Sequence, residues 1–89
     1  MDISYNSYIL RKITGCHRDS LPIEKEISLE NLIGMLSIKY GTIFKDSLLD
    51  EENKTLKMLV LVKGVSITCI EHKITDSDIV NILSFVTGG

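Results

Sequence analysis

The sequence predicts a small α+β domain, in which one main helix packs across one face of a mixed sheet of about five strands. Its 89 residues are 44% hydrophobic and 25% charged, which is typical of a globular domain and not of a disordered chain. Segment 29–40 repeats apolar residues at helical spacing, and short runs rich in β-forming residues lie on both sides of it. The order strand, strand, helix, strand, strand, strand allows the sheet to bury one face beneath the helix.

Two strands are expected before the helix. Segment 2–11 is rich in β-forming residues and predicts the first strand. A polar connection follows, in which Gly15 can adopt a positive φ. Segment 21–27 alternates apolar with acidic residues and predicts a second strand, and Pro22 indicates a sheet edge because it lacks a backbone donor.

The helix has recognisable ends. Ser28 is suited to cap its N-terminus, and Gly41 is placed to end it in the left-handed conformation. Gly34 costs roughly 1 kcal/mol relative to alanine inside a helix, which predicts that another group packs closely against it. The expected core stripe of this helix consists of Leu29, Leu32, Ile33 and Leu36. No second helix is expected.

After the helix, Phe44, Leu48 and Leu49 are expected to anchor an otherwise irregular segment, 43–55, whose charged part is exposed to solvent. Strands are then predicted at 56–62 and 66–70, joined by a turn, and a polar crossing at 72–78 leads to the final strand. We expect the first and last strands to pair in the middle of the sheet. Residues 1–85 would form a single domain, and 86–89 a flexible C-terminal tail.

The final strand carries apolar residues on both faces and runs into Gly88 and Gly89. Val80 and Ile82 point to one face, and Leu83 and Phe85 to the other. If the helix covers the first pair, the second pair is exposed and forms a partner contact, unless segment 43–55 folds over it. Two terminal glycines would let a backbone carboxylate pass through a narrow entry into another protein's active site.

Several segments together resemble the MoaD family of ubiquitin-like sulfur carriers, the small subunits of molybdopterin synthase, whose sister group is ThiS. Archaeal small modifier proteins and the ubiquitin-related modifier are near relatives of these proteins. The resemblance covers nearly the whole chain and rests on Ile9-Leu10-Arg11-Lys12-Ile13-Thr14-Gly15, the helix 29–40, Val60-Leu61-Val62-Lys63-Gly64, Ile74-Thr75-Asp76-Ser77-Asp78-Ile79-Val80 and Thr87-Gly88-Gly89.

The resemblance implies a β-grasp fold and a carrier function. A partner of the ubiquitin-activating type would use ATP to adenylate the carboxylate of Gly89, and a sulfurtransferase would convert it to a thiocarboxylate. Sulfur would then pass to an acceptor, such as a pterin held by a molybdopterin synthase large subunit. Val86, Thr87 and Gly88 would thread into the partner's active site. The alternative within this group is a modifier that Gly89 joins to lysines of target proteins.

An intrinsic enzyme is not expected, and no bound cofactor or metal is expected either. The chain has no phosphate-binding glycine loop, and adjacent Cys16 and His17 rarely orient as a catalytic pair. The two cysteines are expected to be free thiols, with Cys69 as a small apolar residue within a strand, and Asp76 and Asp78 to serve in a turn. A non-covalent binding module that uses the exposed face of the last strand remains a further alternative.

The net charge of −2, with both signs interspersed, disfavours nucleic-acid binding. No apolar run approaches the roughly 20 residues that span a bilayer. The N-terminal segment also does not resemble a secretory signal, so a cytoplasmic protein is expected.

Overall fold

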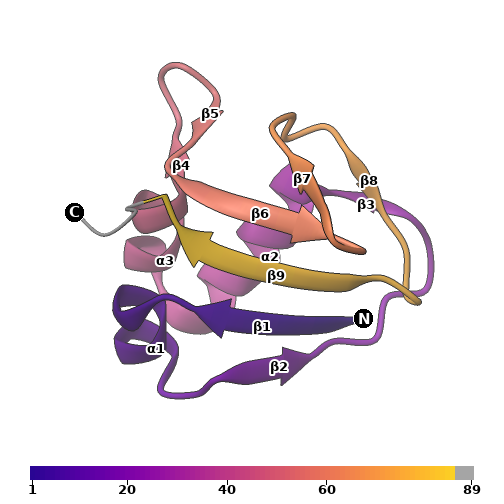
Figure 1. Ribbon diagram of the computed structural model, residues 1–89, viewed down its shortest axis with the longest axis horizontal. Coiled ribbons are helices and arrows are strands. Elements are labelled where there is room, and N and C mark those ends of the chain that lie inside the picture. The colour runs from indigo at the N-terminus through magenta and orange to yellow at the C-terminus, as the bar shows by residue number, and fades with distance from the viewer. Residues whose placement is uncertain (86–89) are drawn as a thin grey trace.

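The computed structural model describes residues 1–85, which form a mixed sheet with helices packed on one face (Figure 1). The helices are α1 (Tyr8–Thr14), α2 (Leu29–Tyr40) and α3 (Thr42–Leu48). The strands are β1 (Asp2–Asn6), β2 (Arg18–Ser20), β3 (Ile27–Ser28), β4 (Leu49–Asp50), β5 (Thr55–Leu56), β6 (Met58–Val62), β7 (Val65–Ile67), β8 (Lys73–Ile74) and β9 (Ile79–Ser84). The α+β architecture predicted from the sequence is confirmed.

The main sheet has five strands in the order β2-β1-β9-β6-β7. As expected, the first and last strands lie at its centre, where β1 and β9 are parallel and Ile3 is paired with Val80. β6 flanks β9 on the other side in antiparallel register. Because β9 is hydrogen-bonded along both edges, it is among the most firmly held strands of the sheet.

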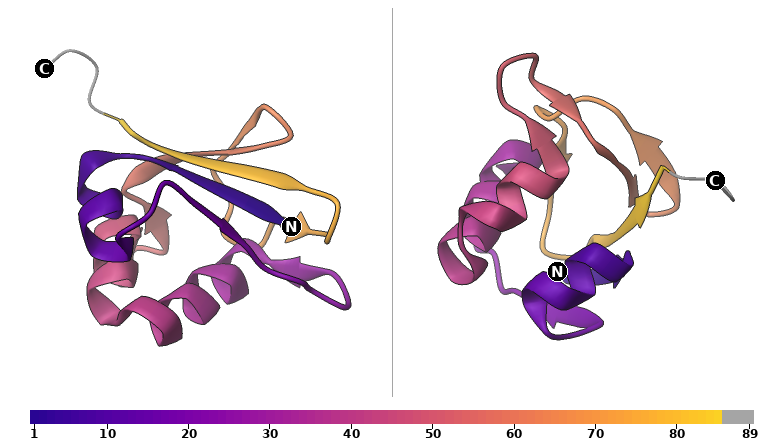
Figure 2. Two further views of the ribbon diagram at one scale, coloured as in Figure 1. Left: turned by 90° about the horizontal axis from the view of Figure 1, so that it is seen from below. Right: turned by 90° about the vertical axis from the view of Figure 1, so that its left-hand side faces the viewer.

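The core lies between the sheet and the helices, as the turned views show (Figure 2). One side chain in two from each central strand points into it, as expected from the two-residue period of a strand. The predicted stripe of α2 fills the opposite side, with Leu29, Leu32, Ile33 and Leu36 at most 2% exposed. Phe44, Leu48 and Leu49 are buried as predicted.

Two helices that the sequence analysis did not predict are present. The expected first strand ends at Asn6, because the Ser7 side chain accepts a hydrogen bond from the Leu10 amide and caps α1. Gly15 ends this helix with φ of 74°, in the predicted positive region. The segment expected to be irregular after Tyr40 begins with α3, and Gly41 joins α2 to it.

Four further local predictions were wrong. Gly41 has φ 97° and ψ 167°, so it is not in the left-handed helical region. A Cβ added at Gly34 would meet no heavy atom within 4 Å, so nothing packs closely against this residue. The second strand lies at 18–20 and not at 21–27. Cys69 is exposed and lies beyond the end of β7.

A polar cluster fastens the edge strand β2 to α2 and β1. The carboxylate of Asp19 accepts hydrogen bonds from the hydroxyls of Tyr5, at 2.8 Å, and Tyr40, and lies 3.0 Å from the Lys39 ammonium. Burial by itself raises the pKa of Asp19, but the hydrogen bonds from Tyr40, Lys39 and Tyr5 outweigh it and hold that pKa below its usual value. The ionised carboxylate therefore stabilises this edge of the fold.

Candidate functional site

The candidate site is the end of β9, from which the chain continues to the two glycines. Ser84, the last residue of β9, is paired with Met58 of β6, and its hydroxyl lies 3.4 Å from that of Ser7 at the start of α1. The strand therefore finishes between β6 and the capped end of α1 (Figure 1). Val86, Thr87, Gly88 and Gly89 lie outside the described residues, so their predicted roles stay predictions.

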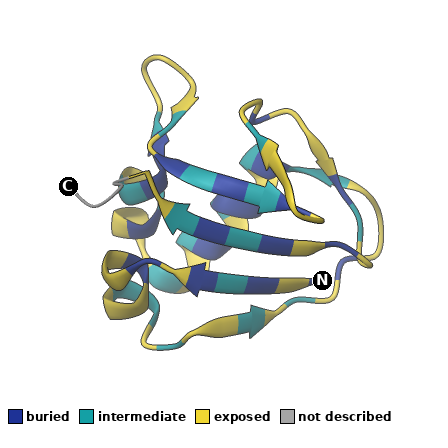
Figure 3. Cartoon of the chain, viewed as in Figure 1, coloured by how far each residue is buried: buried dark blue, intermediate teal, exposed yellow. Residues whose placement is uncertain are grey.

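The two faces of β9 differ as the sequence analysis predicted. Val80 is 0% exposed and Ile82 is 2% exposed, since both point into the core beneath the helices. Phe85 is 52% exposed on the opposite side, whereas Leu83 is only partly exposed. The alternation of buried and exposed residues along the strand is visible in Figure 3.

Leu83 is more covered than expected because its neighbour across the strands is also apolar. It is paired with Leu59 of β6, whose side chain is likewise partly buried on the sheet face away from the helices. Directly opposite side chains in an antiparallel pair lie close enough to shield one another. Leu59, Leu83 and Phe85 therefore form an apolar surface, here called the outer patch.

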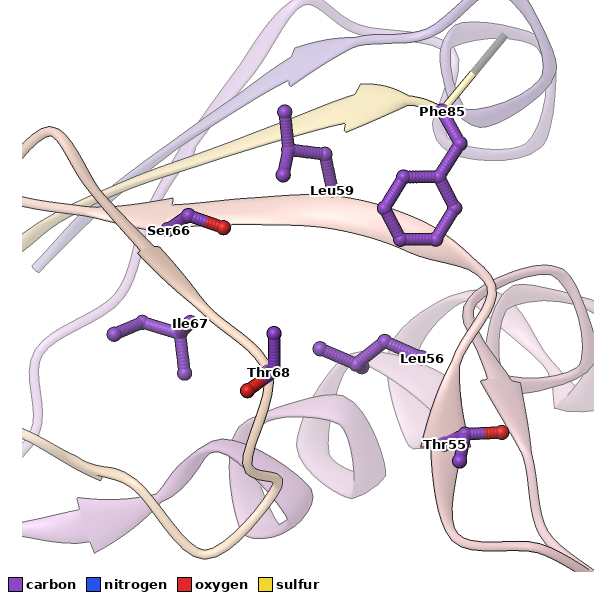
Figure 4. A pocket seen from close by; sticks show the side chains of 7 residues that line it. All are labelled: Thr55, Leu56, Leu59, Ser66, Ile67, Thr68 and Phe85. Atoms are coloured by element: carbon purple, nitrogen blue, oxygen red, sulfur yellow. The ribbon is translucent and has the colours of Figure 1, made fainter.

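A hollow of about 180 Å³ opens beside Phe85 on the outer patch. Figure 4 shows the Phe85 ring at one end of it, with Leu56, Leu59 and Ile67 around the opening. Its remaining lining residues are Thr55, Ser66 and Thr68, so no charged side chain from residues 1–85 lines it. An uncharged hollow next to an exposed aromatic ring is suited to receive an apolar side chain.

The alternative in which segment 43–55 covers the final residues is wrong for Phe85. Only Thr55 of that segment lines the hollow, and half of the Phe85 side chain stays accessible. The tip of the β4–β5 hairpin, 51–54, is exposed, as predicted for its charges. Within the part of the chain that the structure describes, the outer patch therefore stays open.

Polar residues border the outer patch on the β1 side. The Asn6 and Asn81 side chains are hydrogen-bonded to each other across the parallel pair β1 and β9. Arg11 of α1 donates to the Asn6 side-chain oxygen at 3.2 Å and, through Nε, to the Tyr5 carbonyl at 2.8 Å. This network, which the sequence analysis did not anticipate, fixes α1 against the sheet close to the end of β9.

The other side chains considered as candidates do not form a second site. Asp78 accepts a hydrogen bond from the Thr75 amide at 2.8 Å, as predicted for a turn, and its pKa is lowered by this bond and by Lys63, 3.1 Å away. Asp76 accepts instead from the Ile23 amide, at 3.0 Å. The Cys16 thiol lies 3.7 Å from the Tyr40 hydroxyl. Within residues 1–85, no group of three or more His, Cys, Asp or Glu side chains could hold a metal ion, and no helix could span a membrane.

Comparison with known proteins identifies the fold. No protein-family model and no curated protein sequence matches the chain. Three solved structures resemble it over nearly their whole lengths. SAMP1 from Haloferax volcanii has a TM-score of 0.73 at 12% identity and covers 100% of both chains. The HVO 2177 protein of the same organism has a TM-score of 0.72 at 16% identity and covers 100% of this chain and 87% of its own.

The third structure is a proposed subunit 1 of molybdopterin converting factor from Pyrococcus furiosus. It has a TM-score of 0.68 at 15% identity and covers 97% of this chain and 99% of its own. At these identities the comparisons show the fold alone, which is the ubiquitin-like β-grasp fold. The β-grasp fold implied by the resemblance in sequence is thus confirmed.

Proposed function

We propose that this chain is a ubiquitin-like sulfur carrier whose reactive group is the carboxylate of Gly89. The observation that carries the proposal is that β9, a central strand held on both edges, ends next to an exposed aromatic residue and a hollow, shortly before the sequence reaches Gly88 and Gly89. The strand end supplies a firm base, and the outer patch supplies a contact for a partner. Structural likeness to a proposed molybdopterin converting factor subunit makes molybdopterin biosynthesis the favoured pathway.

The chemistry requires a partner. A carboxylate becomes electrophilic only when its oxygen is converted to a good leaving group. A carboxylate oxygen of Gly89 would attack the α-phosphorus of ATP in an activating enzyme, which releases pyrophosphate and forms an acyl adenylate. The terminal sulfur of a sulfurtransferase persulfide would then displace AMP and form an acyl disulfide. A thiol would reduce its S–S bond, which releases the thiocarboxylate and leaves the thiol and the sulfurtransferase sulfur joined as a disulfide.

This chain's own contribution is positioning. Leu83 and Phe85 would dock outside the partner's active site, while residues 86–89 reach roughly 13 Å when extended, at about 3.3 Å per residue. Glycine at the last two positions removes the Cβ atoms that would obstruct a narrow entry and the approach of the nucleophile. The carrier would therefore be a substrate of its partner and not an enzyme.

The proposal is tested by mass spectrometry of the protein isolated from its own cells and after coexpression with an activating enzyme and a sulfurtransferase. The isolated protein should end at Gly89, and coexpression should replace one C-terminal oxygen by sulfur. A variant that lacks Gly88 and Gly89 should gain no sulfur. The control is a second carrier protein, expressed in the same cells, that the activating enzyme is able to load with sulfur. If that carrier gains sulfur while the mass of this protein stays unmodified, the proposal is overturned.

A second candidate is a protein modifier, which the likeness to SAMP1 over the full length of both chains favours. In this case the acyl adenylate of Gly89 would be attacked by a lysine amine, with AMP as the leaving group, and an isopeptide bond would result. Immunoblots of the source cells should then show conjugates that disappear when Gly88 and Gly89 are deleted. Only free protein on such blots would remove this candidate.

A further inference from the structure

The edge of the sheet farthest from β2 carries a second surface, distinct from the outer patch. β7 is the last strand of the five-stranded sheet and pairs with β6 alone within residues 1–85. A groove of about 370 Å³ lies between β7 and the crossing that contains β8. In Figure 1 the β7 and β8 segments, which line this groove, lie at the opposite end of the molecule from α1 and the end of β9.

The backbone at this edge has unpaired positions. β6 and β7 are joined by a two-residue turn, Lys63-Gly64, with φ of 52° and 80°, and Val62 is opposite Val65. In such a hairpin the residues that flank the turn exchange ladder hydrogen bonds, so the next residue directs its N–H and C=O away from the partner strand. That residue is Ser66, whose backbone N–H and C=O therefore face the free edge.

The groove beside this edge has an apolar floor and a basic rim. Val62, Val65 and Ile67 form the floor, and Val65 is 62% exposed because no element covers it. Two lysines, Lys63 and Lys73, line the groove against a single carboxylate, Asp78, which gives it a formal charge of 2 − 1 = +1. The chain as a whole carries −2, so this is a locally basic site on an acidic protein.

Of these charges, only the Lys73 ammonium is free to meet a ligand. Asp78 is already engaged by Lys63, at 3.1 Å, and by the Thr75 amide. Lys73 has no ion-pair partner among residues 1–85, and His72 lines the groove beside it. Glu71 precedes His72 but does not line this groove.

We propose that an extended acidic segment of a partner protein pairs with the free edge of β7 and lays apolar side chains into this groove, with its carboxylates near Lys73 and His72. Edge strands bind such segments through main-chain hydrogen bonds, and side-chain pockets give the specificity. A second copy of this chain is disfavoured as the occupant, because pairing β7 with β7 would bring Lys63 and Lys73 of both copies together.

The test uses a labelled eight-residue peptide of alternating valine and glutamate with capped ends, and a second peptide with lysine in place of glutamate. The glutamate peptide should bind and the lysine peptide should not. Ser66→Pro removes the N–H that faces the free edge but no hydrogen bond between β6 and β7. It should weaken binding of the glutamate peptide roughly tenfold, as expected for the loss of one backbone hydrogen bond. Ser66→Ala keeps this N–H and should bind the peptide as the wild type does. Lys73→Glu should weaken it further, and Lys12→Glu, at the other end of the molecule, is the matched charge control.

If Ser66→Pro does not fold, the binding site can still be located on the wild-type protein from changes in its amide NMR chemical shifts when the glutamate peptide is added. The peptide should shift the amides of 65–68 and 72–74 and leave Leu83 and Phe85 unchanged. Three results would overturn the proposal: no binding of the glutamate peptide, shifts centred on the outer patch, or a monomer–dimer equilibrium that Ser66→Pro abolishes. The third result would identify a second copy of the chain as the occupant, and the first would indicate that the lysines only protect the edge from self-association.

Discussion

Replacing Phe85 by alanine should separate docking from folding. The Phe85 side chain is 52% exposed, so only about half of its area is removed from water on folding. Since full burial of such a side chain contributes roughly 1.5–3 kcal/mol, Phe85→Ala should lower the free energy of unfolding by about 1 kcal/mol. If the ring is an anchor for the activating partner, the same change should cost about 2 kcal/mol of binding, which is roughly a 30-fold loss of affinity.

The measurements are urea unfolding for stability and, for docking, the dependence of ATP–pyrophosphate exchange by the activating enzyme on carrier concentration. Ile79→Ala is the matched control, because Ile79, the first residue of β9, also points away from the core and is 59% exposed, whereas Phe85 directly follows the other end of this strand. By the same reasoning from buried area it should cost roughly 0.5–1 kcal/mol of stability, but it should leave docking unchanged. If Phe85→Ala and the wild-type protein bound the activating enzyme with equal affinity, Phe85 would not be an anchor for that enzyme. This conclusion would hold irrespective of the role of residues 86–89.

Two glycine substitutions and one carboxylate substitution give further predictions, all read from thermal or urea unfolding. Gly34→Ala should raise the free energy of unfolding by about 0.5–1 kcal/mol, because the new methyl group meets nothing within 4 Å. Gly41→Ala should instead be destabilising, because the φ of 97° at this residue is strained for any L side chain. Asp19→Asn should cost about 1–3 kcal/mol at neutral pH, through loss of charged hydrogen bonds to Tyr5 and Tyr40. The pKa of Asp19 is lower in the folded state than in the unfolded state. The stability that the Asp19 carboxylate contributes is therefore complete above the unfolded pKa of about 4 and is lost as the pH falls through the folded pKa. Asp19→Asn has no carboxylate at this position, so its free energy of unfolding should fall less steeply with acid than that of the wild type. If Asp19→Asn lost stability with falling pH as steeply as the wild type, the role given to the Asp19 carboxylate would be wrong. If Gly34→Ala were less stable than the wild type, the open space found at Gly34 would be contradicted.

The sequence was sufficient for the features that depend on strong periodicity. The bounds of α2 and its buried stripe follow from apolar spacing and the Ser28 cap, whose hydroxyl accepts from the Asn31 amide at 3.1 Å. The central pairing of β1 with β9 follows from the need of both terminal strands to bury one face, whereas their parallel direction was not predicted. The two-faced character of β9 also follows from its alternation, which is why the outer patch was predictable.

The missed helices are short, and their β-forming residues concealed them. α1 contains Ile9 and Ile13, so its composition favours a strand, whereas its true signals are the caps Ser7 and Gly15. α3 buries Phe44 and Leu48, four residues apart, and this helical spacing was the available signal. Tertiary packing decides such short elements, because an isolated helix of seven residues is not stable.

The displaced second strand has a different cause. The apolar positions of segment 21–27 include Ile23, which is buried, with 9% of its surface exposed. The Ile23 amide, however, donates to the Asp76 carboxylate and not to a neighbouring strand. The actual strand, β2, consists of polar residues, and Asp19 is tied to Tyr5, Tyr40 and Lys39. Such a strand is defined by long-range hydrogen bonds, which a local pattern does not contain.

The two proposed surfaces divide the sheet between its centre and its edge. If a partner draws in residues 86–89 as proposed, the end of β9 must hold against it, and a strand paired on both sides opens only when much of the sheet opens. β7 is three residues long and paired on one side only, which makes it unsuited to anchor a tail but leaves its backbone available for a visiting strand. The proposed segment pairs with the sheet edge at Ser66 and contacts Ile67, and both residues also line the hollow beside Phe85, so the two surfaces meet at β7. If an activating partner fills that hollow, the β7 peptide should therefore reduce sulfur loading, and unchanged loading at saturating peptide would show that the partner contacts Phe85 without entering the hollow.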